Sequence, residues 1–113
     1  KKTEALQDFE KILVDYNDDS IADETLLKIG KIQQDLKQFN NALTSFNEII
    51  EKHNEGVLVD EALYFSAEIY RRFLKDNEKA KALYEKIIFN HQDSIFFTES
   101  QRQYRLLRGD TNI

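Results

Sequence analysis

The sequence of 113 residues contains no cysteine, no proline and only three glycines. Without cysteine it can form no disulfide framework and carry out no thiolate chemistry. The near absence of helix breakers favours long helices. No apolar run approaches the roughly 18 residues that a membrane-spanning helix requires, so we expect no direct membrane insertion of this stretch.

Positive charge is also scarce, since 16 lysines and arginines stand against 21 acidic residues and leave a net charge of −5. Binding to nucleic-acid phosphates needs a basic face, so we expect no nucleic-acid partner. Methionine is absent as well. Because translation begins with methionine, and because the helical pattern starts at the first residues, we expect a C-terminal fragment of a longer protein.

What is present is helical periodicity. Apolar residues recur on one helical face in six segments, at about 3–16, 21–36, 40–53, 57–74, 77–90 and 95–108. Ser20 with Asp23 resembles a capping box, and Asn40 is a predicted N-cap. Gly56 is predicted to supply the left-handed conformation of a helix end, and Gly109 is predicted to end the last helix. The pattern predicts an all-α fold of about six helices.

The helices repeat in pairs. Ala5, Ala42 and Ala80 are each followed by an aromatic residue and an isoleucine at helical spacing, and they are separated by 37 and 38 residues. A fixed period with two helices per unit predicts a helical solenoid. The extra residue of the second interval is expected in the turn near Lys75, because turns tolerate insertions.

Two of these units resemble tetratricopeptide repeats. The first has Leu26-x-x-Ile29-Gly30 followed by Phe39, Ala42, Phe46 and Ile49, and the second has Leu63-x-x-Ser66-Ala67-x-x-Tyr70 followed by Ala80, Tyr84 and Ile87. The resemblance implies a right-handed α-solenoid of antiparallel helix pairs. Facing small residues, Gly30 with Ala42 and Ala67 with Ala80, would let the helices approach closely.

The period exceeds the usual value of about 34 residues. In this it is similar to the longer-looped repeats of bacterial cell-envelope proteins, which would imply a periplasmic or envelope location. The sequence by itself leaves the localisation unknown.

We expect one domain over residues 1–113. It would comprise the second helix of a truncated repeat at 3–16, repeats at 21–53 and 57–91, and a capping helix at 95–108. Arg105 stands where Gly30 and Ala67 stand in the repeats, which predicts that this last helix faces water there, while Phe96, Phe97, Tyr104 and Leu107 cover the fifth helix. At the other end, an apolar strip involving Leu6, Phe9 or Leu13 is predicted to remain uncovered and to self-associate.

Candidate catalytic and metal-binding residues are few. His53 and His91 occupy equivalent repeat positions, which favours packing at helix ends over metal binding or catalysis. We therefore predict no catalytic residue, no metal and no cofactor. The stripe of Arg102, Arg105 and Arg108 is interpreted as the solvent-exposed face of the capping helix. The alternative is that these arginines contact an acidic surface.

The family resemblance also implies a function, because the first helix of each such repeat lines a concave surface that takes peptides. The matching positions here are Glu24, Leu27, Lys31, Gln34, Glu61, Tyr64, Glu68, Arg71, Arg72 and Arg102. Tyr64 is the predicted aromatic anchor. Leu27 and Glu68 replace two residues of the set with which some family members clamp a terminal carboxylate, so that clamp is not expected.

We interpret the chain as a non-catalytic scaffold that binds a protein or peptide on this surface. A structural spacer within a larger solenoid and an accessory domain of an enzyme are the alternatives.

Overall fold

The structure, a computed structural model, describes residues 1–15, 19–52 and 56–109. This part of the chain forms six α-helices, one short π-helix and no β-strand. Along the chain they are α1 (Lys2–Asp15), α2 (Asp19–Asp35), α3 (Phe39–Lys52), α4 (Val57–Ile69), the π-helix η1 (Tyr70–Leu74), α5 (Asn77–Asn90) and α6 (Phe97–Arg108). The all-α class predicted from the sequence is confirmed.

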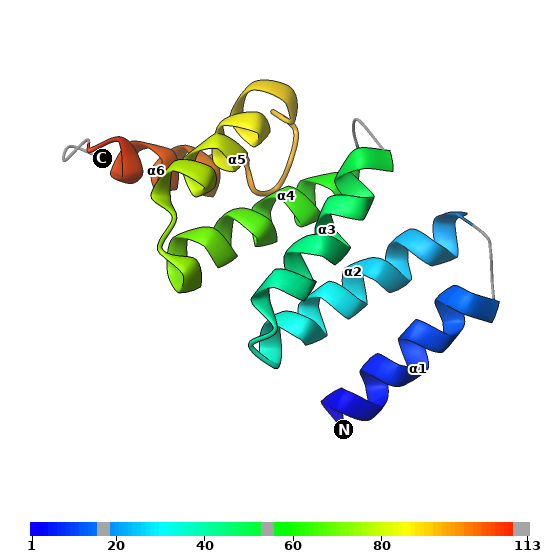
Figure 1. Cartoon of the computed structure of the whole chain (residues 1–113). Helices are drawn as coiled ribbons and strands as arrows, with labels where there is room; N and C mark the ends of the chain where they lie inside the picture. Colours follow the sequence, from blue (N-terminus) through cyan, green and yellow to red (C-terminus); the bar gives the residue numbers. More distant parts are fainter. Residues whose placement is uncertain (16–18, 53–55, 110–113) are drawn as a thin grey trace.

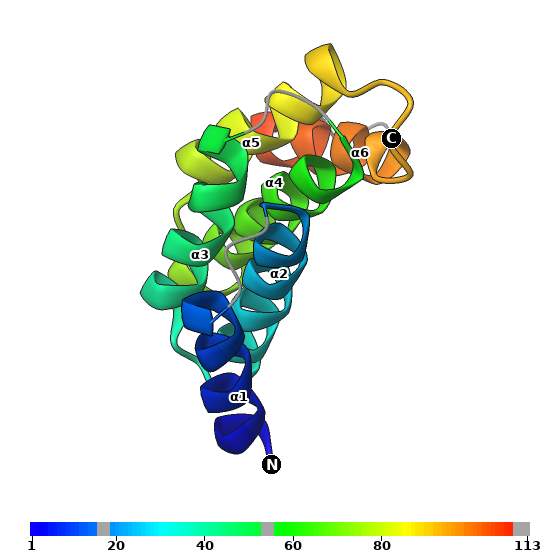
Figure 2. The ribbon, with the colours of Figure 1, turned by 90° about the vertical axis from the view of Figure 1, so that its right-hand side faces the viewer.

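Each helix packs against the next one along the chain and runs back antiparallel to it, as Figure 1 shows. The molecule is consequently elongated, with principal extents of 49 × 27 × 18 Å. Helix α2 also touches α4, two helices further on. In Figure 2, α2 and α6 lie toward the right of the stack, and α3 and α5 lie toward the left. This is a solenoid of helix pairs, in which α2 and α4 are first helices and α3 and α5 are second helices.

The repeated residues form the core. Ala42, Phe46 and Ile49 of α3 and their counterparts in α5 are all fully buried. The larger cluster lies between α2, α3, α4 and α5 and consists of Leu26, Leu27, Ala42, Phe46, Ile49, Val59, Ala62, Leu63, Ile69 and Ile87. A smaller cluster joins Ala67, Ala80 and Tyr84. Sequence positions that look alike therefore perform the same packing task in each repeat.

Small residues permit close contact between helices, as predicted. A Cβ atom on Gly30 would lie only 2.5 Å from Cε1 of Phe46, so the glycine lets the aromatic ring of α3 rest against α2. Ala67 and Ala80 both have no exposed surface and belong to one cluster. The expected partner of Gly30 was Ala42; the contact that excludes a side chain at residue 30 is with Phe46, one turn further along α3.

The turns inside both repeats use a lysine in the left-handed conformation, with φ of 64° at Lys37 and 56° at Lys75. Two capping predictions were wrong. Helix α2 begins at Asp19 and α3 begins at Phe39, so Ser20 and Asn40 lie inside helices. Gly56 does have a positive φ of 120°, but it precedes α4 instead of ending α3.

The extra residue of the second repeat lies in a helix, which corrects the prediction that places it in the turn near Lys75. Ala67 follows Gly30 by 37 residues, whereas Lys75 follows Lys37 by 38, so the insertion falls between these pairs. That interval is occupied by η1, in which the N–H of Lys75 donates to the carbonyl of Tyr70, five residues earlier. A π-helix holds one more residue per hydrogen-bonded turn than an α-helix, so it absorbs the insertion.

The two ends differ partly from expectation. Helix α6 begins at Phe97, and Arg105 is exposed as predicted. Tyr104 and Leu107 do pack against the cluster of Ala67, Ala80 and Tyr84. Phe96, in contrast, stacks on Tyr64 of α4 and does not serve mainly to cover α5.

The predicted N-terminal apolar strip is wrong at Leu6, which is only 8% exposed because α1 packs against α2. Phe9 is half-buried and lies beneath the ammonium of Lys28, with 5.7 Å between Nζ and the ring centroid. The side chain of Leu13 lies outside the described part of the chain.

Candidate partner-binding site

The residues predicted to bind a partner lie on the first helices of the repeats and on α6. We call them the first-helix row: Leu27, Lys31, Gln34, Tyr64, Glu68, Arg71, Arg72 and Arg102. Leu27 is buried in the core, and Glu68 is almost buried. The other six are partly or fully exposed, as is Glu24 one turn before Leu27. Six side chains of the row are thus accessible to solvent, whereas Leu27 and Glu68 are not.

A charge pair links the two repeats along the row. Lys31 of α2 donates a hydrogen bond of 3.1 Å from Nζ to Oε2 of Glu61 on α4. The same ammonium lies over the ring of Phe65, 4.9 Å from its centroid. Cation–π contact and ion pairing together hold Lys31 in one orientation.

Tyr64 lies at the centre of an aromatic group. Its ring stacks on Phe96, with 4.4 Å between centroids and 12° between planes, and meets Phe65 and Tyr84 edge-on. Burial raises the pKa of the Tyr64 hydroxyl, and the nearby carboxylates of Glu68 and Glu99 raise it further. The phenol therefore stays protonated at neutral pH. Tyr64, the predicted aromatic anchor, is partly exposed, and its ring is stacked against the chain's own Phe96.

Glu68 and Arg71 form a polar node with Tyr84 of α5. Nη2 of Arg71 donates to Oε1 and Oε2 of Glu68 at 2.9 and 2.8 Å, and Nε donates to the hydroxyl of Tyr84 at 3.1 Å. The Tyr84 hydroxyl in turn donates to Oε2 of Glu68. Arg72 is more loosely held, with Nη1 3.9 Å from Glu68.

The protonation states of this node are fixed by its surroundings. Burial alone would lower the pKa of the Arg71 guanidinium, but its hydrogen bonds to Glu68 and Tyr84 raise the pKa above the ordinary value. Burial and the hydrogen bond to Glu68 raise the pKa of Tyr84 strongly. At neutral pH the Arg71 guanidinium therefore stays charged and the Tyr84 phenol stays neutral. Sequence reasoning missed Tyr84 as its third member, although a tyrosine at the position of buried Phe46 implies a partner for its hydroxyl.

The row ends at α6. Nε and Nη2 of Arg102 donate to the two oxygens of Glu99 at 3.1 and 2.7 Å, and Gln103 donates to Glu99 at 2.8 Å. These hydrogen bonds lower the pKa of Glu99. Arg102 is therefore charged, exposed and held in a defined direction.

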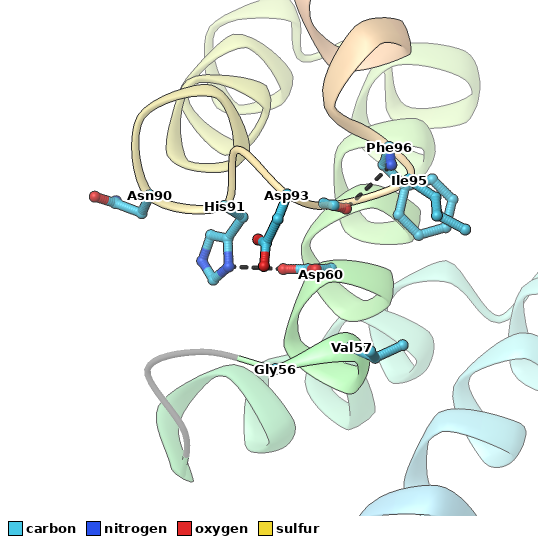
Figure 3. Close-up of a pocket in the computed structure, with 9 residues that line it drawn as sticks. Gly56, Val57, Asp60, Asn90, His91, Asp93, Ile95 and Phe96 are labelled. Atoms are coloured by element: carbon cyan, nitrogen blue, oxygen red, sulfur yellow. Dashed lines mark hydrogen bonds and ion pairs between the residues drawn. The ribbon is translucent and has the colours of Figure 1, made fainter.

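A separate pocket of about 400 Å³ opens beside the start of α4, and Figure 3 shows its lining. The N-terminal turn of α4 forms one wall, and the segment between α5 and α6 forms the other. Val57 and Ile95 at its edges are 70% and 87% exposed. Nδ1 of His91 lies 2.6 Å from Oδ1 of Asp60 inside the pocket.

The pKa of Asp60 is raised above its ordinary value, chiefly because the carboxyl group is buried. The charge of His91 and a hydrogen bond from Ser94 partly offset this increase, and the charge of Asp93 adds to it. His91 is buried, which agrees with its predicted packing role at the end of α5, but its pairing with Asp60 was not predicted. His53, at the equivalent position, lies outside the described residues. Within the described ranges, no three His, Cys, Asp or Glu side chains are grouped to bind a metal ion.

A smaller hollow of about 190 Å³ lies between α5 and α6 and is lined by Ile88, Phe89, Gln101, Tyr104, Arg105 and Arg108. Arg108 lies over the ring of Tyr104, 5.4 Å from its centroid. The predicted arginine stripe is therefore divided: Arg102 belongs to the first-helix row, and Arg105 and Arg108 border this hollow.

Comparison with known families gives one match. A family model described as tetratricopeptide repeat matches residues 24–53 and 61–94, which correspond to the helix pairs α2–α3 and α4–α5 and cover more than half of the chain. No curated protein and no solved structure matches the chain. Among the residues that the structure describes, no helix is both long enough and apolar enough to span a membrane.

Proposed function

Because this chain belongs to the tetratricopeptide repeat family, whose repeats generally mediate protein–protein interactions, we propose that it is a non-catalytic scaffold that binds a peptide or protein segment along its first-helix row. In this proposal the row lies on the concave side of the solenoid, and the segment contacts α2, α4, η1 and α6 in turn. The outer helices α3 and α5 support the row from behind.

The observation that supports the proposal most is the way the exposed side chains of the row are held. Lys31, Tyr64, Arg71 and Arg102 each have a fixed partner within the chain, yet each keeps part of its surface accessible. Side chains that are already ordered lose little conformational entropy when a ligand contacts them, so they favour binding. The shifted pKa values within the row arise from burial and from ion pairs and hydrogen bonds between neighbouring side chains, which fits a scaffold better than a reacting centre.

A steric block tests the proposal. Gln34 is a partly exposed member of the row on α2, and Lys86 is an exposed residue on α5. The chain is used to select binders from a displayed library of random peptides, and selected peptides are then titrated by fluorescence anisotropy against Gln34→Trp and Lys86→Trp. A tryptophan inside a binding groove blocks a seated peptide, whereas the same residue on the opposite helix does not.

We expect Gln34→Trp to weaken binding by about tenfold or more, equivalent to about 1.4 kcal/mol, and Lys86→Trp to leave it unchanged. Circular dichroism of both variants checks that the helices remain intact. Equal effects of the two substitutions would place the site elsewhere. Failure of the wild-type chain to select any peptide would favour the alternative of a structural spacer.

A further inference from the structure

All five arginines of the chain occur in two short elements, Arg71 and Arg72 in η1 and Arg102, Arg105 and Arg108 in α6. The chain as a whole carries a net charge of −5, so this is a local reversal of sign. Three of the arginines, Arg71, Arg72 and Arg102, belong to the first-helix row. We call these three the arginine face.

The arginine face is continuous across two helices. The charge of Arg71 acts on both Glu99 and Arg102 of α6, and the hydroxyl of Tyr64 is influenced by Arg71 and Arg102 together. Arg71 and Arg102 therefore both act on the hydroxyl of the partly exposed Tyr64. Two carboxylates, Glu68 and Glu99, oppose the three guanidinium groups, so an excess of positive charge remains.

The intramolecular pairs leave donors free for a ligand. Arg71 and Arg102 each use Nε and Nη2 toward their own glutamate, and neither donates a hydrogen bond from Nη1 within the described part of the chain. Arg72 lies 3.9 Å from Glu68 through Nη1 and stacks on Phe73, 5.1 Å from the ring centroid. The side chains of Arg72 and Arg102 are 53% and 51% exposed.

Guanidinium groups bind carboxylates in fixed planar geometry, and prior orientation reduces the entropy lost on binding. We propose that the arginine face selects an acidic peptide segment, in which aspartate or glutamate side chains contact Arg71, Arg72 and Arg102 and a neighbouring apolar residue contacts Tyr64. This inference rests on the proposed function, because it names the chemistry of the segment that the row binds.

The test uses the same displayed library of random peptides, now read for composition, and a charge-removing double variant. Arg72→Gln with Arg102→Gln removes two exposed guanidinium groups and leaves the half-buried Arg71 in place. The matched control, Lys11→Gln with Lys86→Gln, removes two exposed positive charges from α1 and α5. Circular dichroism and a denaturant midpoint establish that both double variants remain folded.

We expect peptides selected by the wild-type chain to be enriched in aspartate and glutamate. Their affinity should fall by about tenfold or more in the arginine double variant and by less than about twofold in the lysine control. It should also weaken as salt rises from about 50 to 500 mM, since the contacts are partly exposed.

Two results would overturn the inference while leaving the proposed function intact. One is the selection of peptides without acidic enrichment, and the other is undiminished binding of acidic peptides by the arginine double variant. If the wild-type chain selects no peptide at all, the proposed function fails and this inference fails with it.

Discussion

Substitution of Gly30 by alanine should destabilise the chain, although alanine is the better helix former. Gly30 lies inside α2 and is buried. The added Cβ would lie 2.5, 2.8 and 2.9 Å from Cε1, Cζ and Cδ1 of Phe46. Such contacts are well inside normal van der Waals separation, so either the ring or the helix must move.

The size of the effect follows from two opposing contributions. Replacing glycine by alanine within a helix stabilises it by about 1 kcal/mol. Overpacking a well-filled core costs about 1–3 kcal/mol, and the upper half of that range is appropriate because Phe46 is completely buried and cannot swing into solvent. We therefore expect a net loss of about 1–2 kcal/mol in the free energy of unfolding.

Urea denaturation followed by circular dichroism measures this loss, and a double mutant identifies its cause. In a Phe46→Leu background the ring atoms that meet the new Cβ are gone, so Gly30→Ala should there be neutral or stabilising by up to about 1 kcal/mol. If Gly30→Ala stabilises the otherwise unchanged chain, the close contact does not exist and the packing argument for the whole first repeat fails. If the loss is the same in both backgrounds, the clash is not with Phe46.

Two further substitutions test the polar contacts. Tyr84→Phe removes the hydroxyl that bridges Glu68 and Arg71 and should cost about 1–3 kcal/mol in a urea titration. The control, Tyr70→Phe, keeps the ring that lies beneath the ammonium of Lys79 and should change stability by less than about 0.5 kcal/mol. Equal losses in the two variants would contradict the node. For Asp60, burial raises the pKa above its ordinary value of 3.8, so its contribution to stability is complete below that value and is lost as the pH rises through the folded-state pKa. Asparagine cannot ionise, so the Asp60→Asn variant does not lose this contribution. As the pH rises from below 3.8 through the folded-state pKa of Asp60, the unfolding free energy of the variant should therefore increase relative to that of the unchanged chain. If this difference does not depend on pH, the burial argument is refuted.

The sequence was sufficient to predict the helices and their pairing because both depend on residues that recur at fixed spacing. Ala42 and Ala80, with the aromatic residue four positions later, are fully buried in equivalent places. The position of the insertion was not predictable, since counting residues shows that one is added but not whether a turn or a helix absorbs it. Only the hydrogen bonds to the carbonyl of Tyr70 distinguish the two.

The candidate site was predictable in its membership but not in its contacts. Matching the repeat positions placed Tyr64, Arg71 and Arg102 on one row, whereas the stacking of Phe96 on Tyr64 depends on the path of the segment before α6, which has no periodic signal. The pairing of His91 with Asp60 could have been suspected, because a histidine and an aspartate recur together with the repeat, as His53 and Asp23 show.

Each repeat also carries a buried hydrogen bond between its two helices, and the two hydrogen bonds differ in the charge of the groups that they join. In the first repeat, Ser45 of α3 donates a buried hydrogen bond of 2.7 Å to Gln33 of α2, and neither group carries charge. In the second, Tyr84 of α5 bonds to Glu68, whose carboxylate holds Arg71 from the other side. The orientation of Arg71 is therefore set by α5, although Tyr84 itself has no exposed surface. Tyr84, buried behind the row, thus helps to orient the charge of Arg71, and under the proposed function this one contact would serve both stability and binding.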